Sequence, residues 1–371
     1  MNLIYIDIRY LAPYDKCIRI QGAYKEMALT TKDIALLAGV SQSTVSRSLN
    51  NSRLISQETR ERVLKIAREQ EFEFNANARG LSTNRTHTIG IIFPDEYLDF
   101  GVNLYFGSLH THLRETLEKR DLDLIIAFSQ NRFTGADNIK RLIIRRKVGG
   151  LIIVRSRMAP ETLEFLHQSG IPLVFLHFHQ ESTKLEGIDQ VYTDHVKGGF
   201  LGTEHLIKLR HKKILCISAG EGSEYQQRRR GYRNALETHH IPYDESLILY
   251  GDRSFQSGYD LVMQNRGLLD TVTAVFVHTD VMALGVLEAL KERNIKVPED
   301  IALVGYDDIE LSTYFHPHLT TVHQPREKIA VLACERLFEM IGSKKVKRGK
   351  EIQIQPTLVV RESCGGKTAD R

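Results

Sequence analysis

Five polar side chains lie close together near the start of the 371-residue chain: Gln42, Ser43, Thr44, Ser46 and Arg47. Their amide, hydroxyl and guanidinium groups are donors and acceptors of the kind that bind phosphate oxygens and base edges. A helix that presents such groups near its N-terminus fits the major groove of double-stranded DNA. The chemistry that this spacing predicts is therefore non-covalent contact with DNA.

These side chains need a helix to present them, and residues 30–51 predict two short helices around a tight turn. Thr31 is expected to cap the first helix, Gly39 to end it in the left-handed conformation, and Ser41 to cap the second. The pattern is typical of a helix-turn-helix. An ordinary helical hairpin in an unrelated domain is the alternative, because capped glycine turns are common. The apolar residues at helix-face spacing are Ile34, Ala35, Ala38, Val40, Val45 and Leu49.

The next residues complete a small helical unit with a basic balance. Ser56 is expected to cap a third helix, and Val63, Ile66 and Ala67 fall on its apolar side. Residues 28–86 hold nine basic and six acidic side chains, whereas the whole chain has a formal net charge of only +4. The positive charge is thus concentrated where a phosphate-facing module requires it.

The rest of the composition excludes several classes of protein. The four cysteines lie far apart without CxxC spacing, which predicts neither a zinc site nor a disulfide framework and indicates a reducing cytoplasm. The apolar runs have the length of strands, so we expect no membrane span. Residues 1–27 lack the pattern of a signal peptide. We interpret them as an extension that is either a disordered arm or sequence preceding a natural start at Met27.

From residue 88 onward, apolar runs of strand length alternate with amphipathic helical patterns. Four such runs fall within residues 88–178, and three more follow residue 191. Nearly continuous apolar strands separated by helices are typical of parallel, doubly wound sheets. The sequence therefore predicts an all-α head followed by an α/β core of two doubly wound parallel-sheet lobes. A ligand would bind between the lobes, outside the carboxyl ends of the strands.

A family resemblance rests on these motifs: GVSQSTVSRSLNN at residues 39–51, NANARGL at 75–81, RRRGYRNAL at 228–236, VGYDD at 304–308 and TTVHQP at 320–325. In order and spacing they make residues 29–361 similar to the lactose-repressor family of regulators. The resemblance implies a homodimeric transcription factor whose core resembles periplasmic sugar-binding proteins. The implied domains are an extension (1–27), a helix-turn-helix domain (28–73), a hinge helix and linker (74–87), a first lobe (88–191 and 324–351) and a second lobe (192–323 and 352–371).

The resemblance also implies which head residues contact DNA. The base-reading positions correspond to Gln42, Ser43 and Arg47, and the backbone-contacting positions correspond to Thr44, Ser46 and Asn50. Direct base readout and phosphate contact are the two ways in which such a helix binds its site.

The hinge positions correspond to Asn75, Ala78 and Leu81. Leu81 matches the leucine that wedges into the minor groove at the centre of an operator, which bends the DNA. As an alternative, Leu81 is a linker residue that packs on the core. Phe74 stands where the family usually has proline, so we expect a hinge that is less preorganised.

Effector binding is implied for three residues of the core. Arg228 and Asp307 match the arginine and the carboxylate that bind effectors in this family, and Gln324 lies at the second crossing between lobes. An arginine beside a carboxylate suits a polyol, because hydroxyl groups both donate and accept hydrogen bonds. The alternative is an ion pair between the lobes that binds no ligand.

Other positions in the expected cleft depart from the family pattern. Arg253 stands where many relatives have an aromatic ring, and Thr279 stands where an asparagine is often found. A second arginine near Arg228 would attract an anion, which makes a sugar phosphate or a sugar acid a rival to a neutral sugar. On the first lobe, the opposite wall of the cleft is assigned to Asp95, Tyr97 and Phe100. These residues lie in a loop that can fold in several ways.

Other chemistry finds little support in the sequence. His177 and His179 share one side of a strand but have no third ligand at metal-site spacing, so we expect neither a metal nor a cofactor. The chain has no GxGxxG or GxxxxGKS/T phosphate loop and no nucleophile elbow, so we expect no enzyme. A sugar-processing enzyme fused to a DNA-binding head is a weaker alternative, which needs only a suitably placed pair of carboxylates.

We therefore expect a cytoplasmic, homodimeric repressor of carbohydrate-utilisation genes. The dimer would bind a pseudo-palindromic operator, and a small sugar or sugar derivative in the cleft would control the affinity for DNA. Two alternatives remain, namely control by a partner protein and control by an anionic metabolite that is not a sugar.

Overall fold

The computed structural model describes residues 29–50, 52, 54–70, 72, 86–95, 104–155, 158–177, 187–220, 222–343 and 347–366. The chain forms two compact units, residues 1–86 and residues 87–371, and each is described by itself. The extension at residues 1–27 and the predicted hinge residues Asn75, Ala78 and Leu81 lie outside the described residues. So do Tyr97 and Phe100 of the predicted effector site.

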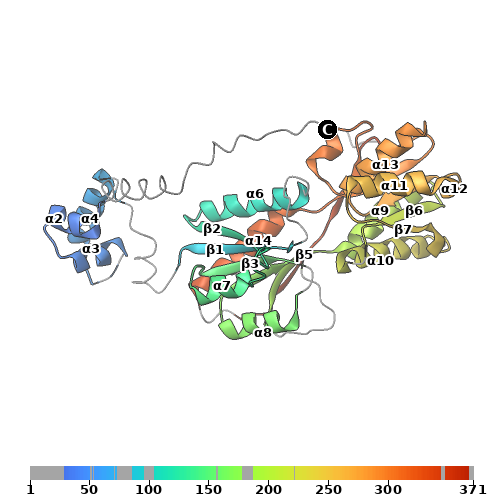
Figure 1. Cartoon of the computed structure of the whole chain (residues 1–371). Helices are drawn as coiled ribbons and strands as arrows, with labels where there is room; N and C mark the ends of the chain where they lie inside the picture. Colours follow the sequence, from blue (N-terminus) through green and yellow to red (C-terminus); the bar gives the residue numbers. More distant parts are fainter. Residues whose placement is uncertain are drawn as a thin grey trace, which may run out of the picture. The chain divides into compact units, whose positions relative to one another are not determined.

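The described part of the first unit contains α2 (Thr31–Ala38), α3 (Gln42–Leu49) and α4 (Gln57–Glu69), which pack on one another (Figure 1). They enclose a small apolar core formed by the buried side chains of Ile34, Ala35, Ala38, Val45, Val63 and Ala67. Each helix contributes residues three or four apart, so one stripe of each helix is buried. The predicted helix-turn-helix and third helix are confirmed.

The caps of these helices agree with the sequence in all but one detail. Gly39 ends α2 with a φ of 63°, and Ser41 and Ser56 cap α3 and α4. The expected cap at Thr31 is wrong, because Thr30 caps α2. Thr30 and Asp33 form a capping box, in which each side chain accepts a hydrogen bond from the backbone N–H of the other. This reciprocal pair satisfies two N–H groups at once, which fixes the helix start at Thr31.

One six-stranded sheet of the second unit has the order β11-β5-β4-β3-β1-β2, with every pair parallel. We call this sheet and its helices the N-lobe. Its strands are β1 (Thr88–Phe93), β2 (Asp123–Phe128), β3 (Gly150–Val154), β4 (Leu173–Leu176), β5 (Asp189–Thr193) and β11 (Glu351–Ile354). Its helices are α6 (Leu104–Glu118), α7 (Asn138–Ile144), α8 (Pro160–Ser169) and α14 (Arg326–Gly342).

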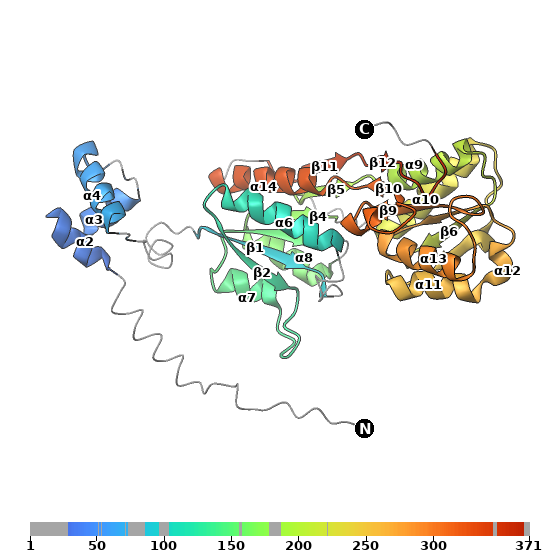
Figure 2. The same cartoon turned by 90° about the horizontal axis from the view of Figure 1, so that it is seen from above.

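The central N-lobe strands β1, β3 and β4 are apolar on both faces because helices cover both faces. On β1, the side chains of Ile89 and Ile91 pack in the core that includes α6, whereas Ile92 packs in the core of the opposite face. The helices α6 and α14 lie side by side on the first face (Figures 1 and 2), and α7 and α8 supply Leu142 and Leu163 to the second. The buried sheet that the apolar runs predicted is thus confirmed.

The other six-stranded sheet has the order β12-β10-β9-β8-β6-β7 and is parallel except for the antiparallel β10 and β12. We call this sheet and its helices the C-lobe. Its strands are β6 (Ile214–Ser218), β7 (Ile248–Tyr250), β8 (Ala274–Val277), β9 (Ala302–Asp307), β10 (Thr320–His323) and β12 (Thr357–Val359). Its helices are α9 (His195–Lys208), α10 (Ser223–Thr238), α11 (Phe255–Gln264), α12 (Arg266–Leu269) and α13 (Asp280–Glu292), with the short 3₁₀ helices η3 (Glu245–Leu247) and η4 (Glu310–Thr313).

The chain passes from one sheet to the other after β5, after β10 and after β11, so neither lobe is a single stretch of sequence. The helix α14 therefore belongs to the N-lobe although the strand before it belongs to the C-lobe. No helix in the described part of the chain is both long and apolar enough to cross a membrane.

The close packing of α9 on α10 depends on glycine. A Cβ atom on Gly231 would collide with the backbone oxygen of Val196, on the facing helix. We expect Gly231→Ala to lower the free energy of unfolding by about 1–3 kcal/mol, because the helices must separate to admit the methyl group. Gly267→Ala is the matched control, since nothing lies near its Cβ position. Urea unfolding measures both, and equal stability of the two variants would contradict this account of the packing.

Candidate DNA interface and interlobe site

The polar residues of α3 lie on its solvent side. Gln42, Ser43 and Arg47 are exposed, whereas Val45 and Ser48 face the core. The Nε2 atom of Gln42 donates a hydrogen bond of 2.8 Å to Thr31 Oγ1, which holds the amide at the helix start. The predicted backbone-contacting residues Thr44, Ser46 and Asn50 are partly exposed on the same helix and at its end. The first turn of α3 therefore presents amide and hydroxyl groups to solvent beside one arginine.

In the described part of the second unit, five polar side chains lie close together where the two lobes meet. We call Arg228, Asp307, Gln324, Tyr105 and His177 the interlobe cluster. Tyr105 and His177 come from the N-lobe, on α6 and just after β4, and the others come from α10 and from the ends of β9 and β10. Three of the residues that the sequence assigned to an effector site are thus adjacent, at the carboxyl ends of parallel strands.

Arg228 lies at the centre of the C-lobe half of this cluster and is only 4% exposed. Its Nη1 atom lies 3.6 Å from Asp307 Oδ1 and also donates to the backbone oxygen of His278. The guanidinium lies over the ring of Tyr306, 3.7 Å from the centroid, in a cation–π contact. Its Nε atom is buried and has no hydrogen-bond partner in the described part of the chain. A buried donor without a partner is costly unless something else accepts its hydrogen bond.

Asp307 is held from several sides. Gln324 Nε2 donates a hydrogen bond of 2.7 Å to its carboxylate, and Arg326 Nη1 donates one of 2.6 Å to its backbone oxygen. Burial raises the pKa of Asp307 to about 6, against the opposing effect of Arg228. The backbone at Asp307 has a φ of 114°, and the loop after it is anchored by the buried Asp280, which accepts from Ile309 N at 3.0 Å. The carboxylate is therefore fixed in position before any ligand arrives.

Hydrogen bonds connect the lobes through Tyr105. Its hydroxyl donates to Gln324 Oε1 at 3.3 Å and shares a hydrogen bond of 3.0 Å with Nε2 of His177. Burial, with a smaller effect from Arg228, lowers the pKa of His177 to about 4, so its imidazole is neutral at pH 7. The imidazole of His195 shares a hydrogen bond of 3.0 Å with Tyr306 OH through Nδ1. The cluster is thus a continuous polar network across both lobes.

We expect His177 to make the stability of the protein fall as the pH is lowered from about 6.5 to about 4. In that window the unfolded chain binds a proton at His177 and the folded chain does not, so the slope reaches at most about 1.4 kcal/mol per pH unit. Asp307 works in the opposite direction, because its folded pKa is raised and the folded state takes up the proton first. His177→Asn should therefore lose less stability than the unmodified protein between pH 6.5 and 5, as measured by urea unfolding. Parallel pH profiles would contradict the assignment.

The remaining predicted effector residues lie outside the interlobe cluster as defined. Thr279 is buried and caps α13, since its Oγ1 accepts from Met282 N at 3.3 Å. Arg253 is exposed in the loop after β7, with a φ of 79°, and its Nε donates to the backbone oxygen of Asp252 at 3.2 Å. The Thr279 contact lies at the start of α13 and the Arg253 contact lies within its own loop, so neither contact is with the interlobe cluster.

Asp95 forms a second polar group at the carboxyl ends of the N-lobe strands. Its Oδ1 atom accepts from Gln130 N at 3.0 Å, and its Oδ2 atom lies 3.6 Å from Nη1 of Arg155. The same Nη1 atom donates to Ser129 Oγ at 2.6 Å. Asp95 follows β1, Ser129 and Gln130 follow β2, and Arg155 follows β3. The sheet topology therefore brings them together although they are far apart in sequence.

Arg326, Tyr105 and Tyr306 were missed by reasoning from the sequence alone. Arg326 directly follows the motif TTVHQP and is the first residue of α14, a helix that the sequence analysis did not predict. Tyr105 falls on the buried stripe of α6, where an aromatic residue signals packing as much as binding. Tyr306 directly precedes Asp307 in the motif VGYDD, whereas only the tertiary structure brings Arg326 and Tyr105 to the network around Asp307.

A helix-turn-helix unit followed by two lobes of parallel sheet, with a buried polar network between the lobes, defines a DNA-binding regulator with a core of the periplasmic-binding type. Residues 30–75 match the bacterial regulatory proteins of the lacI family, and residues 203–364 match the periplasmic binding protein-like domain. The chain belongs to the LacI family and is a DNA-binding transcriptional repressor, not an enzyme.

Relatives along the whole length support this membership. The HTH-type transcriptional repressor PurR of Vibrio parahaemolyticus is 32% identical over 336 residues, which cover 90% of this chain and 98% of that protein. The repressor PurR of Haemophilus influenzae (strain PittEE) is 32% identical over 340 residues, with 90% and 98% covered. The Lac repressor dimer bound to operator and the anti-inducer ONPF superposes with a TM-score of 0.75 at 26% identity, covering 91% of this chain and 99% of that one.

Proposed function

We propose that this repressor binds a small, neutral, hydroxyl-rich molecule, such as a sugar, in the interlobe cluster, and that the ligand controls its affinity for an operator. The observation that carries the proposal is the buried Nε of Arg228, which has no hydrogen-bond partner among the described residues and lies beside the Asp307 carboxylate. A hydroxyl group can accept from the first and donate to the second.

The charges of the cluster favour a neutral ligand over an anion. Arg228 already faces the carboxylate of Asp307 at 3.6 Å. Arg326 donates to the backbone oxygens of Asp307 and Asp308 at 2.6 and 2.8 Å, so its hydrogen-bonding capacity is partly used. Arg253, the second anion-binding group that the sequence suggested, is exposed and bonds within its own loop. Nothing here requires the negative charge of a sugar phosphate or a sugar acid.

Two similar structures contain sugars. The transcriptional regulator CelR–cellobiose complex has a TM-score of 0.67 and 27% identity, covering 90% of this chain and 99% of that one. A LacI family regulator from Enterococcus faecium with bound ribose has a TM-score of 0.63 and 28% identity, covering 75% of this chain and 98% of that one. These likenesses support a sugar as the ligand class for this chain.

A ligand here would act on the contact between lobes. The bond from Tyr105 to Gln324 connects the lobes directly, and the bond from Gln324 to Asp307 continues the network within the C-lobe. A polyol that takes over these donors and acceptors replaces protein–protein hydrogen bonds with protein–ligand ones, and so favours one lobe arrangement over another. Coupling free energies between two such sites are typically about 1–3 kcal/mol.

For the DNA side, we propose that Gln42, Ser43 and Arg47 contact bases. Thr44, Ser46 and Asn50 would contact the backbone. A homodimer in the cytoplasm would place two such helices on a pseudo-palindromic operator, with residues 74–87 as the hinge and Leu81 at the operator centre. Genes for carbohydrate use are the targets that a sugar ligand would imply.

A thermal-shift panel of sugars, sugar phosphates, sugar acids and purine bases tests the ligand class, because a ligand that binds the native state raises the melting temperature. We expect a neutral sugar to raise it and also to change operator affinity measured by fluorescence anisotropy. Arg253→Ala should respond like the unmodified protein. A response only to phosphates or acids would contradict the proposal for a neutral ligand, and a silent panel would favour control by a partner protein.

A further inference from the structure

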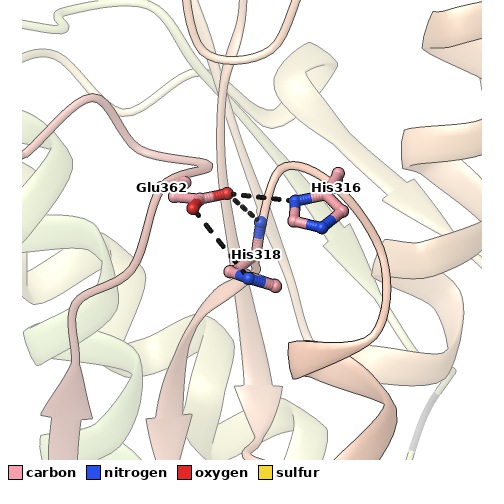
Figure 3. Close-up of side chains that lie close together, drawn as sticks. All are labelled: His316, His318 and Glu362. Atoms are coloured by element: carbon pink, nitrogen blue, oxygen red, sulfur yellow. Dashed lines mark hydrogen bonds and ion pairs between the residues drawn. The ribbon is translucent and has the colours of Figure 1, made fainter.

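A second group of possible ligand atoms lies in the C-lobe outside the interlobe cluster. It consists of His316 and His318, in the loop between η4 and β10, and Glu362, which follows β12. Each residue offers one ligand atom, and these atoms all lie within 4.8 Å of one another. Figure 3 shows the three side chains close together, with dashed lines that join the Glu362 carboxylate to both imidazole rings.

We propose that His316, His318 and Glu362 form a binding site for a divalent late transition metal ion, with Zn²⁺ as the reference ion. Two imidazole nitrogens and one carboxylate oxygen are a ligand set that zinc takes in proteins, with a fourth position left for water. The expectation from sequence was that the chain holds no metal, so this proposal departs from it.

The distances suit such an ion. His316 Nδ1 lies 3.6 Å from Glu362 Oε2, and His318 Nε2 lies 3.9 Å from Glu362 Oε1. Ligand atoms at about 2.0–2.2 Å from a tetrahedral zinc are roughly 3.3–3.6 Å apart, so the two imidazole–carboxylate distances are close to those that the ion requires. The side chains are 76%, 34% and 48% exposed for His316, His318 and Glu362, which leaves the ion a path from solvent.

The backbone around the site is already fixed. Glu362 Oε2 accepts from the backbone N–H of His318 at 2.8 Å, and the backbone N–H groups of Glu362 and Ser363 both donate to His318 O at 3.0 Å. Thr320 N donates to Ser363 Oγ at 2.9 Å, which attaches the start of β10 to the same segment. Because these bonds order the ligands before the metal arrives, little conformational entropy opposes binding.

The charge of the site also favours a cation. Glu362 is the one carboxylate of the group, and metal coordination satisfies it together with the two ring nitrogens. Imidazole ligands select zinc, nickel and copper over magnesium and calcium, which prefer oxygen. Magnesium is therefore the natural negative control. The Nδ1 atom of His318 is buried, so Nε2, which is directed at Glu362, is the ring nitrogen that would bind.

The test is titration of ZnCl₂ into the full-length, untagged protein, followed by isothermal calorimetry and thermal unfolding. At about 100-fold excess over the dissociation constant, the melting temperature should rise by roughly 5 °C. His316→Ala, His318→Ala and Glu362→Gln should each weaken binding at least about tenfold. Glu362→Gln is the sharpest of these, because its amide oxygen can still accept from His318 N while the charge is lost.

Matched variants separate this site from other metal-binding groups. His240→Asn removes an exposed histidine of the same lobe, and Cys17→Ser removes a cysteine outside the described residues; both should bind zinc like the unmodified protein. With Co²⁺, the near-ultraviolet spectrum should lack sulfur-to-metal charge transfer. Zinc binding that survives in all three site variants, a thiolate spectrum, or no rise in melting temperature would each overturn the proposal. MgCl₂ that stabilises as well as ZnCl₂ would overturn the metal class.

Discussion

Asp307→Ala is expected to abolish the ligand response and to lower the free energy of unfolding by about 3–5 kcal/mol. The loss of stability follows from Arg228, which is 4% exposed and would remain as a buried charge without its carboxylate. Gln324 would lose the acceptor of its 2.7 Å hydrogen bond as well. The response is lost because the carboxylate is the acceptor proposed for ligand hydroxyls. Urea unfolding and operator titrations with and without ligand measure the two effects.

A double replacement separates stability from recognition. Replacing both partners of a buried ion pair by apolar residues of similar volume is often neutral or stabilising. The variant with Arg228→Met and Asp307→Leu should therefore recover most of the stability that Asp307→Ala loses, yet remain insensitive to ligand. Operator binding without ligand should persist in this variant, since the head is a separate unit. If Asp307→Ala is as stable as the unmodified protein, the variant does not leave Arg228 as a buried charge without a partner, and this account of the ion pair is wrong.

The layered core was predictable because its strands are buried on both faces. The runs that form β1, β3 and β4 are almost entirely apolar, and this pattern has few explanations other than a covered parallel sheet. The helix α14 was not predicted, although Ile329, Ala333 and Leu337 fall on one face at helical spacing. The antiparallel edge strand β12 has three residues and gives almost no pattern.

The interlobe cluster was only partly predictable. Arg228, Asp307 and Gln324 were assigned by their places in family motifs, and the structure brings them together. Arg326 and Tyr105 contact the same carboxylate network, but this depends on α14 and α6 beginning beside the ends of the C-lobe strands, which no local pattern encodes. Arg253 was expected near Arg228 because of its place in the family pattern, and that place falls in a loop. Its backbone at φ 79° is left-handed, and side-chain direction cannot be inferred from spacing in such a loop.

Arg47→Ala is expected to weaken operator binding by roughly 30-fold to 20,000-fold. One arginine contact to a base is worth about 1–3 kcal/mol, and a homodimer loses two of them, so the loss is about 2–6 kcal/mol. The head should stay folded, because Arg47 is exposed on α3 and alanine is a good helix former. The operator is first selected from a randomised DNA pool with the unmodified protein, and fluorescence anisotropy at one fixed salt concentration then compares the two proteins.

The size of the loss on a nonspecific duplex decides what Arg47 does. A base contact affects the selected operator far more than a random sequence, whereas a phosphate contact weakens both about equally and reduces the salt dependence. Lys291→Ala is the charge-matched control, since it removes one exposed positive charge from the C-lobe and should leave both affinities unchanged. Equal losses on both duplexes would make Arg47 a backbone contact, and unchanged operator binding would move the reading surface off α3. Because α3 presents only one arginine among short hydroxyls and an amide, most of its charge-assisted recognition depends on this side chain.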